Sequence, residues 1–125
     1  MTQAARQMRI PDETHPIAIS DHGETVEVYI AGQRIARSER ALKLAEASYP
    51  HVLYIPREDV DMTALRRRED TSYCPFKGDA NYYDIEAGGE TADKAVWTYE
   101  APYEFVARIK DHLAFYTNKV EVRAA

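Results

Sequence analysis

Residues 71–83, TSYCPFKGDANYY, contain the chemistry around which the rest of the chain is organised. The stretch holds the only cysteine of the protein, Cys74, followed by Pro75, Lys77 and Gly78. A thiol, an amine and a carboxylate fall within six positions, and an aromatic pair typical of a strand follows them. Known catalytic signatures do not have this form. The stretch therefore predicts where a site lies, but it does not predict a reaction.

Composition limits the class of protein. The chain has 125 residues, which is enough for one domain with its own core. A net charge of −5 and a pI near 5.4 argue against a nucleic-acid backbone as partner. A single cysteine excludes an internal disulfide and permits a reducing compartment. Residues 1–16 lack an apolar core of signal-peptide length, and no apolar run reaches membrane-spanning length. We expect a cytoplasmic protein without nucleic-acid or membrane partners.

The pattern of apolar residues outward from the central stretch predicts a mainly β fold. We expect residues 1–14 to form a loose N-terminal tail, or an arm that covers a sheet edge, and residues 15–125 to form a single β domain. Residues 41–46 favour helix by propensity, but their leucines share a face only at period two, so we favour a strand. The expected strands cover 17–19, 26–30, 34–38, 41–46, 52–55, 80–86, 94–100 and 120–122. Short turns join most of them, including glycine-containing turns at 31–33 and 87–90.

Two helices are also expected. Asp59 or Asp61 is placed to cap a short helix that runs through residues 62–65. Pro102 suits the first turn of a longer helix near the C-terminus, whose apolar stripe would be Val106, Ile109 and Leu113. The predicted fold class is thus α+β, a compact antiparallel β domain with one C-terminal helix packed on the sheets.

Cys74 has two interpretations. A thiol becomes a nucleophile when a nearby positive charge or backbone N–H groups stabilise the thiolate, and Lys77 lies three residues away. A free cysteine is also among the most frequently buried residue types and then serves only in packing. The four histidines are scattered along the sequence, so no Cys-His pair is indicated.

The remaining polar residues predict no metal site and no cofactor. Zinc sites usually need three or four ligands with paired spacing, which one cysteine and four isolated histidines do not supply. Asp59 is a candidate general base, although capping is the commoner role of an aspartate in that position. Glu46 is harder to assign to the surface, because its period-two partners are Leu42 and Leu44. The arginine run 66–68 is followed by two acidic residues and is typical of a solvated face.

Aromatic residues supply a second kind of candidate site. If the expected strands are neighbours, alternate rings would line a common wall, as in small-molecule pockets. Cross-strand packing inside the core is the alternative. The rings in question are Tyr54, Tyr73, Tyr82, Tyr83, Trp97 and Tyr99.

A series of short motifs resembles one known family. In order along the chain they are Ala36-x-Ser38, Tyr54-x-Pro56-x-x-Asp59-Val60, Cys74-Pro75-Phe76-Lys77-Gly78-x-Ala80-x-Tyr82-Tyr83, Trp97-x-Tyr99-x-x-Pro102 and Leu113-Ala114-Phe115-Tyr116. Together they are similar to the bacterial family called domain of unknown function 427, over about residues 15–123. The resemblance implies a compact β fold of the Mss4-like or β-tent group. Relatives in that wider group often bind zinc through paired cysteines, which this chain lacks, and some bind ligands in an aromatic cage.

Three functions are therefore carried forward. The favoured one is a small-molecule-binding β domain whose pocket is formed by Tyr54, Lys77, Tyr82, Trp97 and Glu46. The second is an enzyme that uses Cys74 as thiolate nucleophile or redox centre, with Lys77 and Asp59 as further catalytic candidates. The third is a homodimeric interaction module that pairs through a tyrosine-rich sheet face.

Overall fold

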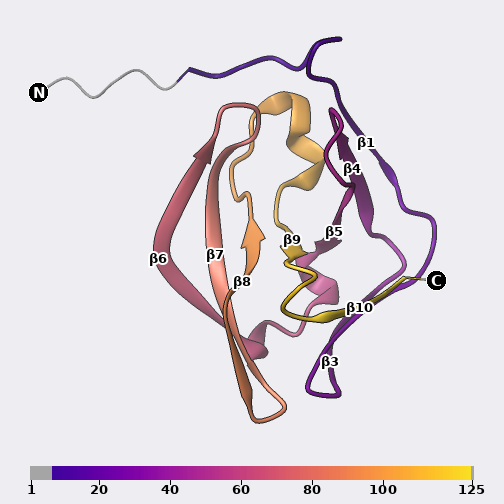
Figure 1. Ribbon diagram of the computed structural model, residues 1–125, viewed down its shortest axis with the longest axis vertical. Helices are drawn as coiled ribbons and strands as arrows, with labels where there is room; N and C mark the ends of the chain where they lie inside the picture. The colour runs from indigo at the N-terminus through magenta and orange to yellow at the C-terminus, as the bar shows by residue number, and fades with distance from the viewer. Residues whose placement is uncertain (1–6, 125) are drawn as a thin grey trace, which may run out of the picture.

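Two antiparallel sheets make up the fold of the computed structural model, which describes residues 7–124 (Figure 1). Seven strands form the larger sheet, in the order β1-β4-β5-β9-β8-β7-β6, and three form the smaller one, in the order β10-β2-β3. The strands are β1 (Ile17–Asp21), β2 (Val26–Ile30), β3 (Gln33–Ser38), β4 (Leu42–Glu46), β5 (Val52–Pro56), β6 (Leu65–Cys74), β7 (Gly78–Ala87), β8 (Glu90–Thr98), β9 (His112–Phe115) and β10 (Glu121–Ala124). The mainly β, antiparallel prediction is confirmed, including the strand at residues 42–46.

Alternation along the strands gives the larger sheet two apolar faces. Tyr54 and Ile55 are consecutive on β5, yet they belong to two separate buried clusters, and Tyr82 and Tyr83 on β7 are divided in the same way. The first cluster packs against the smaller sheet, whose β2 buries alternate residues. The second cluster lies on the other face and includes two residues of the short segment η3 (Glu104–Ile109).

Gly88 fixes the contact between two hairpin tips. Its φ is +62°, and a Cβ built there would lie 2.7 Å from the Cβ of Ala31 in the β2–β3 turn. The Gly88 amide also donates a hydrogen bond of 2.8 Å to Oε1 of Gln33. Glycine is thus required both for the turn and for the close approach of the two sheets.

The prediction of a C-terminal helix is wrong. Residues 104–109 form only a 3₁₀ segment, η3, which is interrupted at Val106 with φ −122°, and Asp111 has a φ of +57°. Leu113, the third residue of the expected stripe, lies in β9 between β5 and β8. Both neighbouring strands need a hydrogen-bonding partner there, and this requirement outweighs the helical pattern. Val106 and Ile109 are nevertheless buried, as a packed apolar stripe requires.

Strand β6 was not predicted from the sequence. Residues 65–74 pair with β7, so the central stretch is part of a hairpin. The helix expected at residues 62–65 is only a 3₁₀ turn, η2 (Met62–Ala64), which is capped by Asp61. Asp59 lies in the neighbouring turn η1 (Arg57–Asp59) and caps neither. The run 66–68 belongs to an edge strand, where charged side chains are tolerated on both sides. Each of its arginines pairs with a carboxylate, namely Glu86, Glu100 and Asp84.

No helical segment in residues 7–124 combines the length and the apolar character that crossing a membrane requires. Residues 1–6, the first part of the expected tail, lie outside the described residues.

Candidate functional site

The β6–β7 turn brings Lys77 into the protein. Cys74 and Gly78 are paired across the hairpin, and the Lys77 amide donates a hydrogen bond of 3.2 Å to the carbonyl of Cys74. Gly78 has a φ of +107°, a conformation that other residues rarely adopt. This turn directs the Lys77 side chain inward, where only 8% of it is exposed.

Lys77 forms an ion pair with Glu46, the last residue of β4. Its Nζ also lies 3.9 Å from Sγ of Cys74. Burial raises the pKa of the Glu46 carboxyl, but hydrogen bonds from Lys77 and His15 act in the opposite direction and leave that pKa below its usual value. Glu46 is therefore a carboxylate, and each of its oxygens holds one partner.

The segment before β1 lies over the same turn. Nε2 of His15 is 2.7 Å from Oε2 of Glu46, and the His15 ring stacks on Phe76 with centroids 4.1 Å apart. The Arg9 amide donates to the Pro75 carbonyl, and its guanidinium lies 4.9 Å from the Phe76 ring centre. Figure 1 shows this segment passing the β6–β7 turn. Residues 9–15 thus cover the turn and join its ion pair.

Beside this ion pair is a cavity of about 250 Å³ with mainly aromatic walls. It is lined by Leu44, Glu46, Val52, Tyr54, Lys77, Tyr82, Trp97, Tyr99 and Tyr116. The Trp97 indole donates a hydrogen bond of 3.2 Å to the hydroxyl of Tyr54, and the two rings meet edge to face. Burial raises the pKa of both Tyr54 and Tyr99, so these phenols stay neutral and can donate hydrogen bonds.

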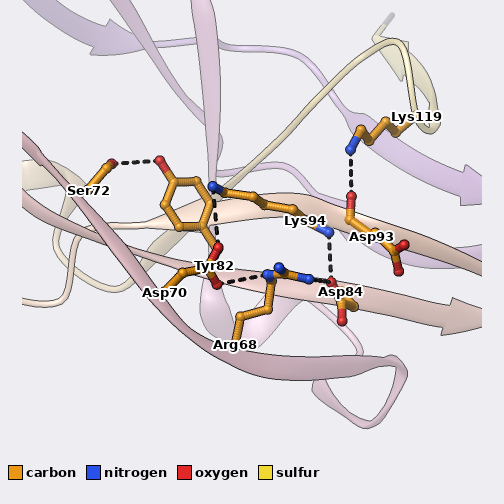
Figure 2. A network of polar contacts seen from close by, with 8 residues as sticks. All are labelled: Arg68, Asp70, Ser72, Tyr82, Asp84, Asp93, Lys94 and Lys119. Atoms are coloured by element: carbon orange, nitrogen blue, oxygen red, sulfur yellow. Dashed lines mark hydrogen bonds and ion pairs between the residues drawn. The ribbon is translucent and has the colours of Figure 1, made fainter.

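Tyr82 is held in the cavity wall by a polar network outside it (Figure 2). The register of β7 is interrupted against both neighbours close to this residue, on β6 between Arg67 and Thr71 and on β8 near Lys94. Such bulges redirect side chains. Ser72 Oγ lies 2.7 Å from the Tyr82 hydroxyl, and Lys94 Nζ lies 4.5 Å from the ring centre.

Two aspartates fix that lysine in turn. Asp70 Oδ2 is 3.3 Å from Nζ of Lys94, and Asp84 Oδ1 accepts the Lys94 backbone N–H at 2.7 Å. Arg68 bridges the two aspartates at 2.8 and 2.7 Å (Figure 2). The backbone N–H of Lys94, helped by Arg68, holds the pKa of Asp84 below its usual value, although burial raises it. The network therefore orients Tyr82 through charged residues that do not line the cavity.

Tyr116 forms the more open side of the cavity. It directly follows β9, is 36% exposed, and its ring centre lies 4.6 Å from that of Trp97. The two rings meet at a tilt of 48°, as aromatic pairs often do. Lys119 Nζ lies 5.9 Å from the Tyr116 ring centre.

Most of the residues singled out from the sequence meet here. Tyr54, Tyr82, Trp97, Lys77 and Glu46 all line the one cavity. Cys74 is not among the lining residues, although its Sγ lies 3.9 Å from Nζ of Lys77.

Asp59, in contrast, lies elsewhere. It accepts hydrogen bonds from Ser38 at 2.7 Å and from Arg40 at 3.0 Å. Burial raises its pKa, but these two bonds lower it by more. Asp59 therefore fixes β3 to the turn after β5 and has no contact with Lys77.

Sequence reasoning missed His15 and Tyr116 as parts of the site. His15 is 31 residues from Glu46, so sequence spacing gives no sign of their contact. Tyr116 belongs to a motif of the resembling family, and this was the only available signal. Of the other rings considered, Tyr73 bonds to Tyr103, and Tyr83 belongs to the opposite cluster.

Within the described part of the chain, no three His, Cys, Asp or Glu side chains come close enough to hold a metal ion.

The sequence comparison decides the family. The model of domain of unknown function 427 (DUF427) matches residues 18–125. The chain belongs to the DUF427 family. Apart from Ile17, the match includes both sheets and every residue of the cavity, but it begins after His15. No curated protein matches the chain.

Proposed function

We propose that this DUF427 domain binds a small planar molecule that carries a neutral amide-like group in the aromatic cavity. The observation that supports the proposal is that five aromatic side chains and the Lys77–Glu46 pair line one cavity of about 250 Å³. Cavities for drug-sized ligands usually exceed about 300 Å³, so the ligand is small. Apolar walls with a few placed polar groups are characteristic of such sites.

The ion pair determines the chemistry of the ligand. Lys77 can donate to a carbonyl oxygen, and Glu46 keeps free lone pairs that accept an N–H. A carboxylate ligand would be repelled by Glu46, and an amidinium ligand by Lys77. A neutral amide satisfies both groups, while Tyr54 and Trp97 contact its ring.

Three nearly identical probes test this choice: benzamide, benzoate and benzamidine. Trp97 is the only tryptophan, so its fluorescence reports directly on the cavity. We expect saturable binding that is tighter for benzamide than for benzoate or benzamidine. The melting temperature should rise most with benzamide. Lys77→Met should remove this preference, whereas Lys110→Met, at an exposed lysine outside the cavity, should not. Equal binding of all three probes, or none, would contradict the proposal.

The distance between Lys77 and Cys74 favours a second candidate function, an enzyme with Cys74 as its nucleophile. Nζ of Lys77 lies 3.9 Å from Sγ of Cys74, and a nearby ammonium stabilises a thiolate. Under this enzyme hypothesis, iodoacetamide alkylates Cys74 faster in the native protein than in the unfolded one, and Lys77→Met slows the native reaction. A native thiol that is inert until unfolding would reject a nucleophilic role for Cys74.

We also infer that the fold is of the Mss4-like or β-tent type and that the protein is cytoplasmic. Two antiparallel sheets around a shared core support the first inference, and a chain with one free cysteine is consistent with the second.

A further inference from the structure

We propose that a second cavity, between the two sheets, binds a medium-length alkyl chain with a carboxylate head. Its volume is about 500 Å³, twice that of the aromatic cavity. The proposal goes beyond the amide site, because most of the lining residues differ and the class of ligand is different.

The walls of this inter-sheet cavity combine aliphatic and aromatic side chains. The smaller sheet contributes Val26 and Val28 from β2 and Val122 from β10, and the larger sheet contributes Leu53 and Ile55 from β5. Val122 pairs directly with Val28, so the two short side chains stand together. Because valines reach less far than the residues opposite, the sheets leave space between them. Such walls offer an alkyl chain contact without hydrogen-bonding partners.

Polar side chains gather at one end. His51 directly precedes β5 and Thr117 follows β9, and because these strands pair antiparallel, the start of β5 and the end of β9 lie at the same end of the sheet. His51, Thr117 and Asn118 line the cavity and are exposed, so this end is its mouth. A ligand that fits has an apolar chain and one polar head.

The charge at the mouth favours an anionic head. Tyr116 lines the mouth, and Nζ of Lys119 lies 5.9 Å from its ring centre. Lys119 donates a hydrogen bond to the backbone carbonyl of Asp93. This contact brings no carboxylate to the ammonium of Lys119. Lys119 is not part of the cavity lining, but its ammonium near the Tyr116 ring attracts a carboxylate head, to which Thr117 and Asn118 offer neutral donors.

The two cavities share one wall, made of Val52, Trp97 and Tyr116. Trp97 fluorescence consequently reports on either of them. The ligands are told apart by variants, since Lys77 lines only the aromatic cavity and Val122 only the inter-sheet cavity.

The test is a titration of the unmodified protein with hexanoate, heptanoate and octanoate below their aggregation concentrations. Burial of each added methylene should strengthen binding about fourfold. Octanol should bind more weakly than octanoate, and Lys119→Met should remove that difference. An affinity that does not change with chain length would overturn the proposal.

Variants locate the site. Val122→Phe fills the cavity from an edge strand and should weaken octanoate binding at least about tenfold, given the methylenes it displaces. Val120→Phe is the matched control, because it makes the same change outside this cavity. Benzamide binding should survive Val122→Phe, so failure of the amide site is distinguishable from failure of this one. Unchanged octanoate affinity in a folded Val122→Phe protein, or its loss in Lys77→Met, would contradict the assignment.

Discussion

The two faces of the larger sheet differ in what they bury. The face toward the smaller sheet buries mainly aliphatic residues, together with two aromatic side chains, Tyr83 and Phe115. The opposite face buries tyrosines next to an ion pair between Lys77 and Glu46. An aliphatic cluster stabilises a fold without further partners, whereas a buried ion pair contributes little net stability. We therefore propose that the aromatic cavity beside the ion pair serves recognition, whereas the aliphatic burial on the first face chiefly stabilises the fold.

The largest effect is expected from Ile85 on the aliphatic face. Ile85 is fully buried, so Ile85→Ala should lower the free energy of unfolding by about 2–5 kcal/mol through lost burial and a cavity. Urea unfolding measures this. Ile10→Ala, at a side chain that is 68% exposed, is the control and should change little. A small loss for Ile85→Ala would remove the assignment of this face to stability.

The ion pair provides the sharper test. Lys77→Met leaves Glu46 with only His15 as a partner, and we expect a loss of about 3 kcal/mol in unfolding free energy. In the double variant Lys77→Met/Glu46→Leu both members of the ion pair are replaced by apolar residues, so much of that stability should return. Benzamide binding should be lost in both variants. If the double variant is as unstable as the single one, the pair serves structure rather than recognition.

Alternation explains how much of this comparison was predictable from sequence. Period two set Glu46 on the same face as Leu42 and Leu44. Grouping Tyr54, Tyr82 and Trp97 in one wall depended on the condition that their strands are neighbours and on the motif positions of the resembling family. The helix expected around Leu113 was wrong, because residues 113–115 are buried on both faces of β9 and so fit a strand as well as an apolar stripe. Hydrogen bonds to β5 and β8, which are distant in sequence, decided between them.

Contacts between charged residues explain why strand β6 and the role of His15 were not predicted. The arginines of β6 lie in a stretch without apolar alternation. Apart from Asp70, which pairs with Arg68 within β6, their carboxylate partners lie on β7 or after β8. His15 meets Glu46 only once the segment before β1 crosses the turn at Phe76. Long-range ion pairs leave no local pattern in the sequence, so no reading of single segments would have found them.

A moderate loss of unfolding free energy is expected at the contact between the two hairpin tips. Gly88→Ala combines a positive φ with a 2.7 Å approach to Ala31, and should cost about 2 kcal/mol. Gly89→Ala is the matched control: it has a φ of +78° but no atom within 4 Å, so only the backbone strain of about 1 kcal/mol remains. Thermal or urea unfolding compares the two. Equal losses would show that the contact between the tips adds nothing to the joining of the sheets.

The smallest effect concerns pH. The pKa of Glu46 is lower in the folded protein than its ordinary value of 4.5, so the folded state favours the carboxylate. Its contribution to stability is thus present above pH 4.5 and is lost as the pH falls through the folded pKa. Glu46→Gln should make stability less dependent on pH in this range, by comparison of urea unfolding at pH 6 and below. An unchanged pH dependence would mean that Lys77 and His15 do not stabilise the Glu46 carboxylate in the folded protein.

The most direct test of the recognition face is the NMR signal of the Trp97 indole N–H. Trp97 is the only tryptophan, and this N–H donates to Tyr54 inside the aromatic cavity. Benzamide should shift the signal saturably in the unmodified protein and leave it unmoved in Lys77→Met/Glu46→Leu. A shift of equal size and affinity in the double variant would contradict a role for the ion pair in binding, and with it the functional difference between the two faces.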